Sequence, residues 1–248
     1  MKLTRTSFIP QVARGARACL ALALLACAAC AQLGGSTRGE GNSPRPPRGN
    51  GAPLVYVAIG DSTGIGLGAR NGGGYVERLF EKMRAASPGA RLVNLSRVGA
   101  ATADALQQQL PRVPADATII TVGVGANDVM GEVDEESFAN AYESLVAKAR
   151  QTGASVVAMT IPDLNAAHGI PPPRRAVVAS RVEKFNRRIE EAAARSGILL
   201  VDLYRAGGKK PEVGSNFFSP DGLHPSDEGY AFWAGALWEK IEPALGGR

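Results

Sequence analysis

The chain has 248 residues, 45% of them hydrophobic, which is enough to bury the core of one substantial domain. Its formal net charge is +5. The charged side chains before residue 54 contribute +6 to this value; they are Lys2, Arg5, Arg14 and Arg17, then Arg38, Glu40, Arg45 and Arg48. The remaining chain therefore has a net charge of −1, which argues against nucleic-acid binding.

The first 31 residues have the pattern of a bacterial export signal. A positively charged start precedes an apolar run, Ala18 to Ala26, that is too short to span a bilayer. Leu24-Leu25-Ala26-Cys27 resembles a lipobox, which would make Cys27 the lipidated first residue of an envelope lipoprotein. We favour this ending because it lies close to the apolar run. Alternatively, cleavage follows Ala29-Cys30-Ala31 and releases a soluble, secreted protein.

The numbers of cysteines and histidines limit the chemistry that the chain can perform. All three cysteines, Cys19, Cys27 and Cys30, lie in the export signal, so the rest of the chain has no disulfide and no thiol nucleophile. With only two histidines as well, the sequence implies no metal site, and we expect no cofactor.

The segment after the export signal has little apolar surface to bury. Residues 32–53 are mostly Gly, Ser, Pro, Arg and Asn, which predicts a disordered tether to the membrane. The domain is expected to span residues 54–248.

From Leu54 onward, apolar runs typical of strands alternate with helical patterns. The expected strands are residues 54–59, 91–95, 117–124, 154–161 and 198–203. The expected helices are residues 74–86, 102–110, 135–151, 174–196 and 226–245, with Thr102 and Ser226 as N-caps of the second and last. This alternation predicts an α/β domain with a five-stranded parallel sheet and helices on both faces.

A tight turn presents a serine directly after the first expected strand. The apolar run ends at Gly60, and Asp61 and Ser62 follow. The carboxyl ends of strands are where open α/β sheets bind ligands, so the Ser62 hydroxyl is a candidate nucleophile.

The same stretch offers a competing interpretation. Gly64, Gly66 and Ala69 match the dinucleotide-binding pattern G-x-G-x-x-A. However, Gly64 comes five residues after the strand, and residues 85–98 contain no Asp or Glu to bind a ribose. We therefore interpret these glycines as part of a flexible loop.

A second candidate pair precedes the last helix, in Ser-Pro-Asp-Gly-Leu-His-Pro. Asp221 and His224 are three residues apart, which lets the carboxylate reach the imidazole Nδ1–H while Nε2 faces outward. A serine hydroxyl needs such a base at neutral pH. Ser62, His224 and Asp221 are therefore candidates for a nucleophile, its base and the orienting acid.

Four pieces of this sequence resemble, in order, the motifs of the SGNH (GDSL-type) hydrolases: Gly60-Asp61-Ser62, Gly99, Gly125-Ala126-Asn127-Asp128 and Asp221-Gly222-Leu223-His224. The resemblance implies a flavodoxin-like three-layer α/β/α sandwich and hydrolysis of esters or thioesters. It implies that Ser62, His224 and Asp221 are catalytic. It also implies an oxyanion hole formed by the Ser62 and Gly99 N–H groups and the Asn127 side chain. The family's usual leucine after the serine is Thr63 here, at a position that does no chemistry.

Other polar and aromatic residues near these motifs have simpler interpretations. Asp61 and Asp128 are expected to brace loops by accepting backbone N–H bonds. His168 has no carboxylate at the spacing of a triad, so we expect no catalytic role for it. Phe217 and Phe218 precede the Asp221 turn and are candidates to line an acyl pocket. The last helix carries aromatic and aliphatic residues at helical spacing, which predicts core positions for Tyr230, Trp233, Leu237, Trp238 and Ile241.

The sequence therefore predicts an exported serine esterase with a small-molecule or glycan acyl ester as substrate. The expected connections are short, which favours short-chain or carbohydrate O-acyl esters. A lysophospholipase or thioesterase on the same scaffold is the alternative enzyme. A non-catalytic envelope protein that binds glycans is the alternative from another class.

Overall fold

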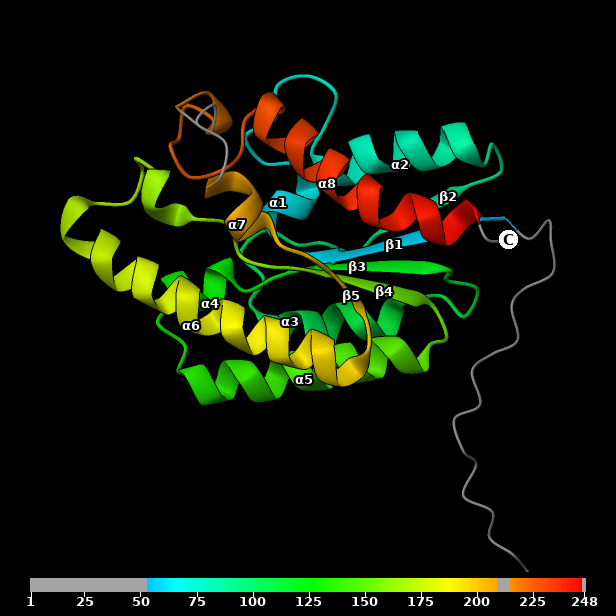
Figure 1. The fold of residues 1–248 in the computed structure, drawn as a ribbon, viewed down its shortest axis with the longest axis horizontal. Helices are drawn as coiled ribbons and strands as arrows, with labels where there is room; N and C mark the ends of the chain where they lie inside the picture. Colours follow the sequence, from blue (N-terminus) through cyan, green and yellow to red (C-terminus); the bar gives the residue numbers. More distant parts are fainter. Residues whose placement is uncertain (1–52, 209–214, 247–248) are drawn as a thin grey trace, which may run out of the picture. The chain divides into compact units, whose positions relative to one another are not determined.

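The computed structural model describes residues 53–208 and 215–246 (Figure 1). The predicted export signal and all but the last residue of the predicted tether lie outside these residues. No helix within the described ranges is long and apolar enough to cross a membrane.

Five parallel strands form one sheet in the order β2-β1-β3-β4-β5. They are β1 (Val55–Gly60), β2 (Arg91–Asn94), β3 (Ile119–Gly123), β4 (Ser155–Met159) and β5 (Leu199–Val201). This is the flavodoxin-like order, in which the chain reverses direction across the sheet between β1 and β3. The predicted five-stranded parallel sheet is confirmed, although most of the observed strands are shorter than the apolar runs.

Helices cover both faces of the sheet (Figure 1). Alternate side chains of β1 point to opposite faces, because a strand has a two-residue period. Val55, Val57 and Ile59 pack with α5 (Glu135–Gln151) and α6 (Pro172–Ser196). Tyr56 and Ala58 pack with α2 (Tyr75–Ala86) and α8 (Asp227–Gly246). All six β1 residues are buried, so β1 is the centre of the core.

Three short helices begin within three residues of the end of a strand. They are α1 (Ser62–Ile65) after β1, α4 (Ala126–Met130) after β3 and α7 (Leu203–Gly208) after β5. Each begins at the carboxyl edge of the sheet, so the side chains of its first turn lie at that edge. The sequence periodicity did not predict these helices, because one or two turns are too short to show a period.

The segment after β2 differs from the predicted helix. It begins as α3 (Thr102–Asp104), continues as a π-helical turn η1 (Ala105–Gln109) and ends as a 3-10 turn η2 (Leu110–Arg112). The N-cap is Ala101 and not Thr102. The Thr102 N–H and hydroxyl both donate to Asp128, so a tertiary contact takes the place of the predicted cap.

The other helix boundaries need smaller corrections. Helix α6 begins at Pro172, two residues before the predicted start, because a proline in the first turn loses no helical hydrogen bond. Ser226 is confirmed as a cap, since its hydroxyl accepts the Gly229 N–H at 3.2 Å. In α8, Tyr230, Trp233, Leu237 and Ile241 are buried as predicted, and Trp238 is partly buried. The two remaining 3-10 turns are η3 (Leu164–Ala166) and η4 (Ser215–Phe217).

Candidate active site

The turn after β1 places Ser62 at the start of α1. The Asp61 carboxylate caps this helix by accepting the N–H and the hydroxyl of Thr63, each at 2.8 Å. This confirms the prediction that Asp61 braces the turn. Burial raises the pKa of the Asp61 carboxyl, and the two Thr63 bonds oppose that rise. Ser62 itself is only 8% exposed, so most of the residue is shielded from bulk water.

Tight packing beneath the turn after β1 explains why Gly60 and Gly64 carry no side chain. A Cβ on Gly60 would lie 2.8 Å from the Ser96 hydroxyl oxygen, and a Cβ on Gly64 would lie 2.2 Å from it. Gly64 is buried in α1, so the interpretation of this residue as part of a flexible loop is wrong. These glycines let the backbone approach Ser96 closely.

A buried glutamine that the sequence did not single out fixes the end of β1. The Gln109 side-chain amide donates to the Gly60 carbonyl at 2.8 Å and accepts the Gly60 N–H at 2.9 Å. The π-helical turn η1 carries Gln109 into this position. Helical periodicity could not have found it, because the period changes within the segment.

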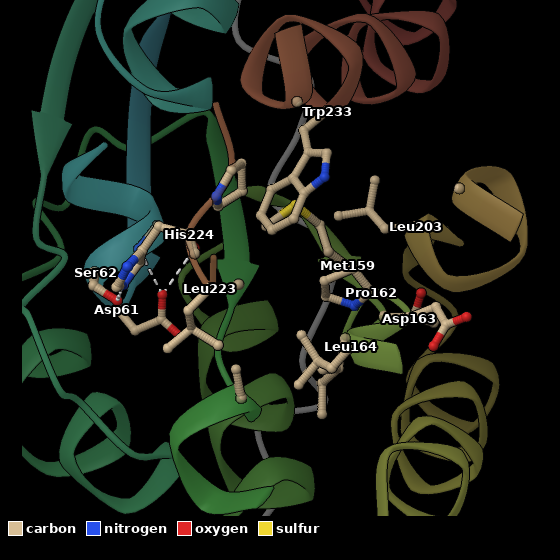
Figure 2. Close-up of a pocket in the computed structure, with 18 of the residues that line it drawn as sticks. Asp61, Ser62, Met159, Pro162, Asp163, Leu164, Leu203, Leu223, His224 and Trp233 are labelled. Atoms are coloured by element: carbon tan, nitrogen blue, oxygen red, sulfur yellow. Dashed lines mark hydrogen bonds between the residues drawn. The ribbon is translucent and has the colours of Figure 1, made fainter. Parts of the chain in front are cut away.

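Ser62, His224 and Asp221 form a continuous chain of hydrogen bonds. Figure 2 shows Ser62 and His224 of this chain side by side. His224 Nε2 lies 2.9 Å from Ser62 Oγ, and His224 Nδ1 lies 2.7 Å from Asp221 Oδ2. Ser62 and His224 are 162 residues apart in sequence and meet at the carboxyl edge of the sheet. The sequence prediction thus named three residues that the structure brings together.

The local turn holds the Asp221 carboxylate in place. Its Oδ1 atom accepts the N–H groups of Leu223 and His224 at 2.8 and 2.9 Å, which leaves Oδ2 for the imidazole. Partial burial disfavours the charged carboxylate, but these hydrogen bonds outweigh it and hold the pKa of Asp221 well below its ordinary value. Asp221 is therefore ionised at neutral pH and can stabilise a positive imidazole ring.

Gly222 within this turn has a left-handed backbone, with φ of 70°. A Cβ there would lie 2.5 Å from His168 Cδ2 and 2.6 Å from the Gly169 nitrogen. The Gly169 N–H also donates to the Gly222 carbonyl at 2.9 Å. His168 is exposed and packs edge-on against Phe218, so its place in the structure is beside the Asp221 turn.

The segments that carry Asn127 and Gly99 are linked to each other. Asn127 Nδ2 donates to the Ala100 carbonyl at 3.1 Å and lies 3.5 Å from Asp61 Oδ2. Asp128 accepts the Thr102 N–H at 2.9 Å, which confirms its predicted bracing role, and burial raises its pKa. Gly99 has φ of 77° and is exposed.

A cavity of about 240 Å³ opens beside Ser62 and His224. Of the predicted site residues, Ser62, Asn127, His224, Phe217 and Phe218 line it. Gly99, Asp221 and His168 are not among its lining residues. Within residues 53–208 and 215–246, no group of three His, Cys, Asp or Glu side chains is arranged to hold a metal ion.

Sequence reasoning missed several residues of the cavity wall. Met159 and Leu203 were assigned only to strands, and Trp233 only to the core, yet all three also face the cavity. Phe232 was not singled out, although it lines the wall as well. An apolar residue at helical or strand spacing gives no signal that separates a core position from a cavity wall.

A hydroxyl hydrogen-bonded to an imidazole, which is in turn bonded to a carboxylate, can lose its proton to the ring as it attacks a carbonyl carbon. A parallel sheet in this order with such a constellation at its carboxyl edge is the arrangement of the SGNH hydrolases. Comparisons with known proteins agree with that class. The model of the GDSL-like lipase/acylhydrolase family matches residues 58–232.

Three relatives illustrate the similarity. The GDSL-like esterase Rv1075c of Mycobacterium tuberculosis is 30% identical over 223 residues, which cover 84% of this chain and 68% of the relative. A lipase/acylhydrolase from Enterococcus faecalis has a TM-score of 0.63 at 20% identity, over 77% of this chain and 96% of its own. TesA has a TM-score of 0.61 at 24% identity, over 77% of this chain and 99% of its own. At these identities the two structures support the fold alone.

The chain belongs to the GDSL-like lipase/acylhydrolase family. It is a hydrolase that acts on ester bonds.

Proposed function

We propose that the protein cleaves carboxylic acyl esters through an acyl-enzyme on Ser62. The observation that carries the proposal is the hydrogen-bonded chain Ser62–His224–Asp221 at the edge of an apolar cavity. Ser62 Oγ forms a bond to the ester carbonyl carbon while its proton passes to His224 Nε2. The tetrahedral intermediate then expels the alcohol, which takes that proton from His224. Water next attacks the acyl-serine while His224 accepts its proton. The second tetrahedral intermediate then expels Ser62 Oγ, which takes that proton from His224 as the carboxylic acid is released.

The negative oxygen of the tetrahedral intermediate needs hydrogen-bond donors. We assign this role to the Ser62 N–H, the Gly99 N–H and the Asn127 side-chain amide. One such donor typically stabilises the transition state by about 3 kcal/mol. Asn127 supports the assignment best, because it lines the cavity and its nitrogen lies 3.1 Å from the Ala100 carbonyl, which orients the amide.

Covalent labelling tests the nucleophile directly. A fluorophosphonate probe forms a bond from phosphorus to an activated serine oxygen and releases fluoride. We expect mass spectrometry to find the label on the Ser62 peptide of the wild-type protein and to find none on Ser62→Ala. A non-catalytic glycan-binding protein, which is the rival from another class, would bind sugars without being labelled. Labelling at another serine, or none at all, would overturn the assignment.

The next question is which acyl group and which alcohol or thiol the substrate contains. The short connections favour short acyl chains or carbohydrate O-acyl esters, while lysophospholipids and thioesters are the alternatives on this scaffold. A screen of p-nitrophenyl acyl esters, acetylated sugars, a lysophospholipid and an acyl thioester separates these classes. A preference for the thioester or the lysophospholipid would displace the first choice.

We also propose that residues 1–31 direct export and that Cys27 becomes lipidated, with residues 32–53 as a tether. The sequence pattern alone supports this, because these residues lie before the described structure apart from Pro53. Several acyl chains, as expected on a bacterial lipoprotein, would anchor the protein firmly to a membrane. Mass spectrometry of the mature N-terminus should find a lipidated Cys27. An unmodified Gln32 at that terminus would mean that the protein is secreted without an anchor.

A further inference from the structure

The cavity beside Ser62 has two ends of different chemistry. Ser62, Asn127 and His224 provide polar groups at one end. Most of the remaining wall is apolar and comes from the end of β4, from η3, from α7, from the segment before Asp221 and from α8. Its residues include Met159, Leu164, Leu203, Phe218, Phe232 and Trp233. Figure 2 shows Met159, Leu203 and Trp233 across the cavity from Ser62 and His224. A group bonded to Ser62 would therefore extend along an apolar wall.

The volume of the cavity exceeds what a small acyl group needs. An apolar cavity of about 150 Å³ is enough to hold benzene, whereas this one has about 240 Å³. At roughly 30 Å³ per water-sized group, the cavity corresponds to about eight such groups, and a methylene is of similar size. An acetyl group would leave most of the apolar wall without a partner.

Aromatic contacts fix much of this wall. Trp233 is only 8% exposed. The centroid of its ring lies 5.8 Å from that of the Tyr75 ring and 6.0 Å from that of the Tyr230 ring. Phe232 and Phe217 pack edge to face at 5.6 Å. Met159 adds a flexible thioether side chain that adapts to the shape of a bound chain. The cavity is thus largely formed before a ligand enters, and little ordering entropy opposes binding.

The charged groups among the described lining residues disfavour an anionic ligand. Among the described residues that line the cavity there is no lysine or arginine, and the carboxyl groups of Asp61 and Asp163 are present. A phosphate or a second carboxylate would find no cationic partner among them. The wall fits a neutral hydrocarbon chain.

We propose that this cavity is an acyl-binding chamber for acyl groups of roughly six to eight carbons, a length set by its volume. Leu203 and Trp233 limit the chain length. This inference rests on the proposed function, because the acyl carbonyl must sit at Ser62. It selects a longer acyl group than the short connections of the chain alone favour.

The test is the chain-length dependence of kcat/KM for the full-length protein with p-nitrophenyl esters from acetyl to dodecanoyl. Each methylene that enters the chamber should raise kcat/KM by about fourfold, the fold-change that corresponds to about 0.8 kcal/mol per buried methylene. The increase should stop at about eight carbons, where the chamber is full.

A matched pair of variants tests the wall. Leu203 is 2% exposed and faces the chamber, so Leu203→Phe should shorten it. We expect this variant to lower the ratio of octanoyl to acetyl kcat/KM by about sixteenfold, the equivalent of excluding two methylenes at about fourfold each. Leu199→Phe makes the same change on β5, at a 38% exposed position that does not line the chamber, and should keep the wild-type profile.

The wild-type series decides the proposal even if Leu203→Phe fails to fold. An optimum at acetyl, or a flat profile, would overturn the chamber while ester hydrolysis continues. The chamber would also be overturned if kcat/KM depended on acyl chain length in the same way for the wild type and for a folded Leu203→Phe. Failure of the proposed function looks different, because no ester would be hydrolysed and Ser62 would stay unlabelled.

Discussion

Ser62→Ala is expected to lower kcat for ester hydrolysis by at least about three orders of magnitude, because the members of a catalytic triad act as a unit. The variant keeps the backbone of α1, since the Asp61 cap bonds to Thr63 and not to the Ser62 side chain. Within the triad, the substitution removes the hydrogen bond between Ser62 Oγ and His224 Nε2, at 2.9 Å. The unfolding midpoint should therefore stay close to that of the wild type.

Ser155→Ala provides the control for this measurement. Ser155 is exposed at the first residue of β4, at the opposite end of the strand from the site. The kcat and the unfolding midpoint of Ser155→Ala should both match those of the wild type. Near-wild-type esterase activity in pure, folded Ser62→Ala would contradict the mechanism.

The sheet could be predicted because its central strands are apolar on both faces. β1 is buried at all six positions, and the sequence from Val55 to Gly60 shows this as a run without charge. Alternation with long amphipathic helices such as α5 then requires parallel strands and crossovers. Ser62 and His224 could be singled out by their chemistry and Asn127 by the resemblance to the SGNH hydrolases, and all three line the cavity.

Most of the cavity wall beyond Phe217 and Phe218 could not be predicted, because it combines residues from distant segments. Met159, Leu203 and Trp233 meet only after the sheet and α8 have packed. Their hydrophobicity predicts burial, and burial looks the same for a core residue and for one that faces a cavity. Gln109 is a similar case, because its buried amide pairs with Gly60 only through the π-helical turn.

The ionisation of Asp221 gives a prediction about stability. Hydrogen bonds hold its pKa below the ordinary value despite partial burial. Its charged form therefore stabilises the fold above the unfolded-state pKa of about 3.9, and this contribution is lost as the pH falls toward the folded-state pKa. The difference in unfolding free energy between wild type and Asp221→Asn should thus be largest near neutral pH and shrink on acidification. An unchanged difference from neutral pH to pH 3 would contradict the pKa shift.

The same variant has a large expected effect on catalysis, because the backbone dictates how the new amide would lie. Asp221 Oδ1 accepts two N–H groups, from Leu223 and His224, so the amide oxygen that Asp221→Asn introduces must take that position. The amide NH₂ then faces His224 Nδ1, in the place of Oδ2. A donor there requires Nδ1 to be unprotonated, which puts the proton on Nε2 and leaves no base for the Ser62 hydroxyl.

We therefore expect Asp221→Asn to fold and to lower kcat by about three to four orders of magnitude, with a much smaller change in KM, because the wrong tautomer removes the base and not the binding surface. Asp134→Asn is the matched control. Asp134 caps α5 by accepting the Ser137 N–H at 2.9 Å, and asparagine caps equally well. This control should retain wild-type kcat. If Asp221→Asn keeps more than about a tenth of the wild-type kcat, a fixed His224 tautomer is not what activates Ser62.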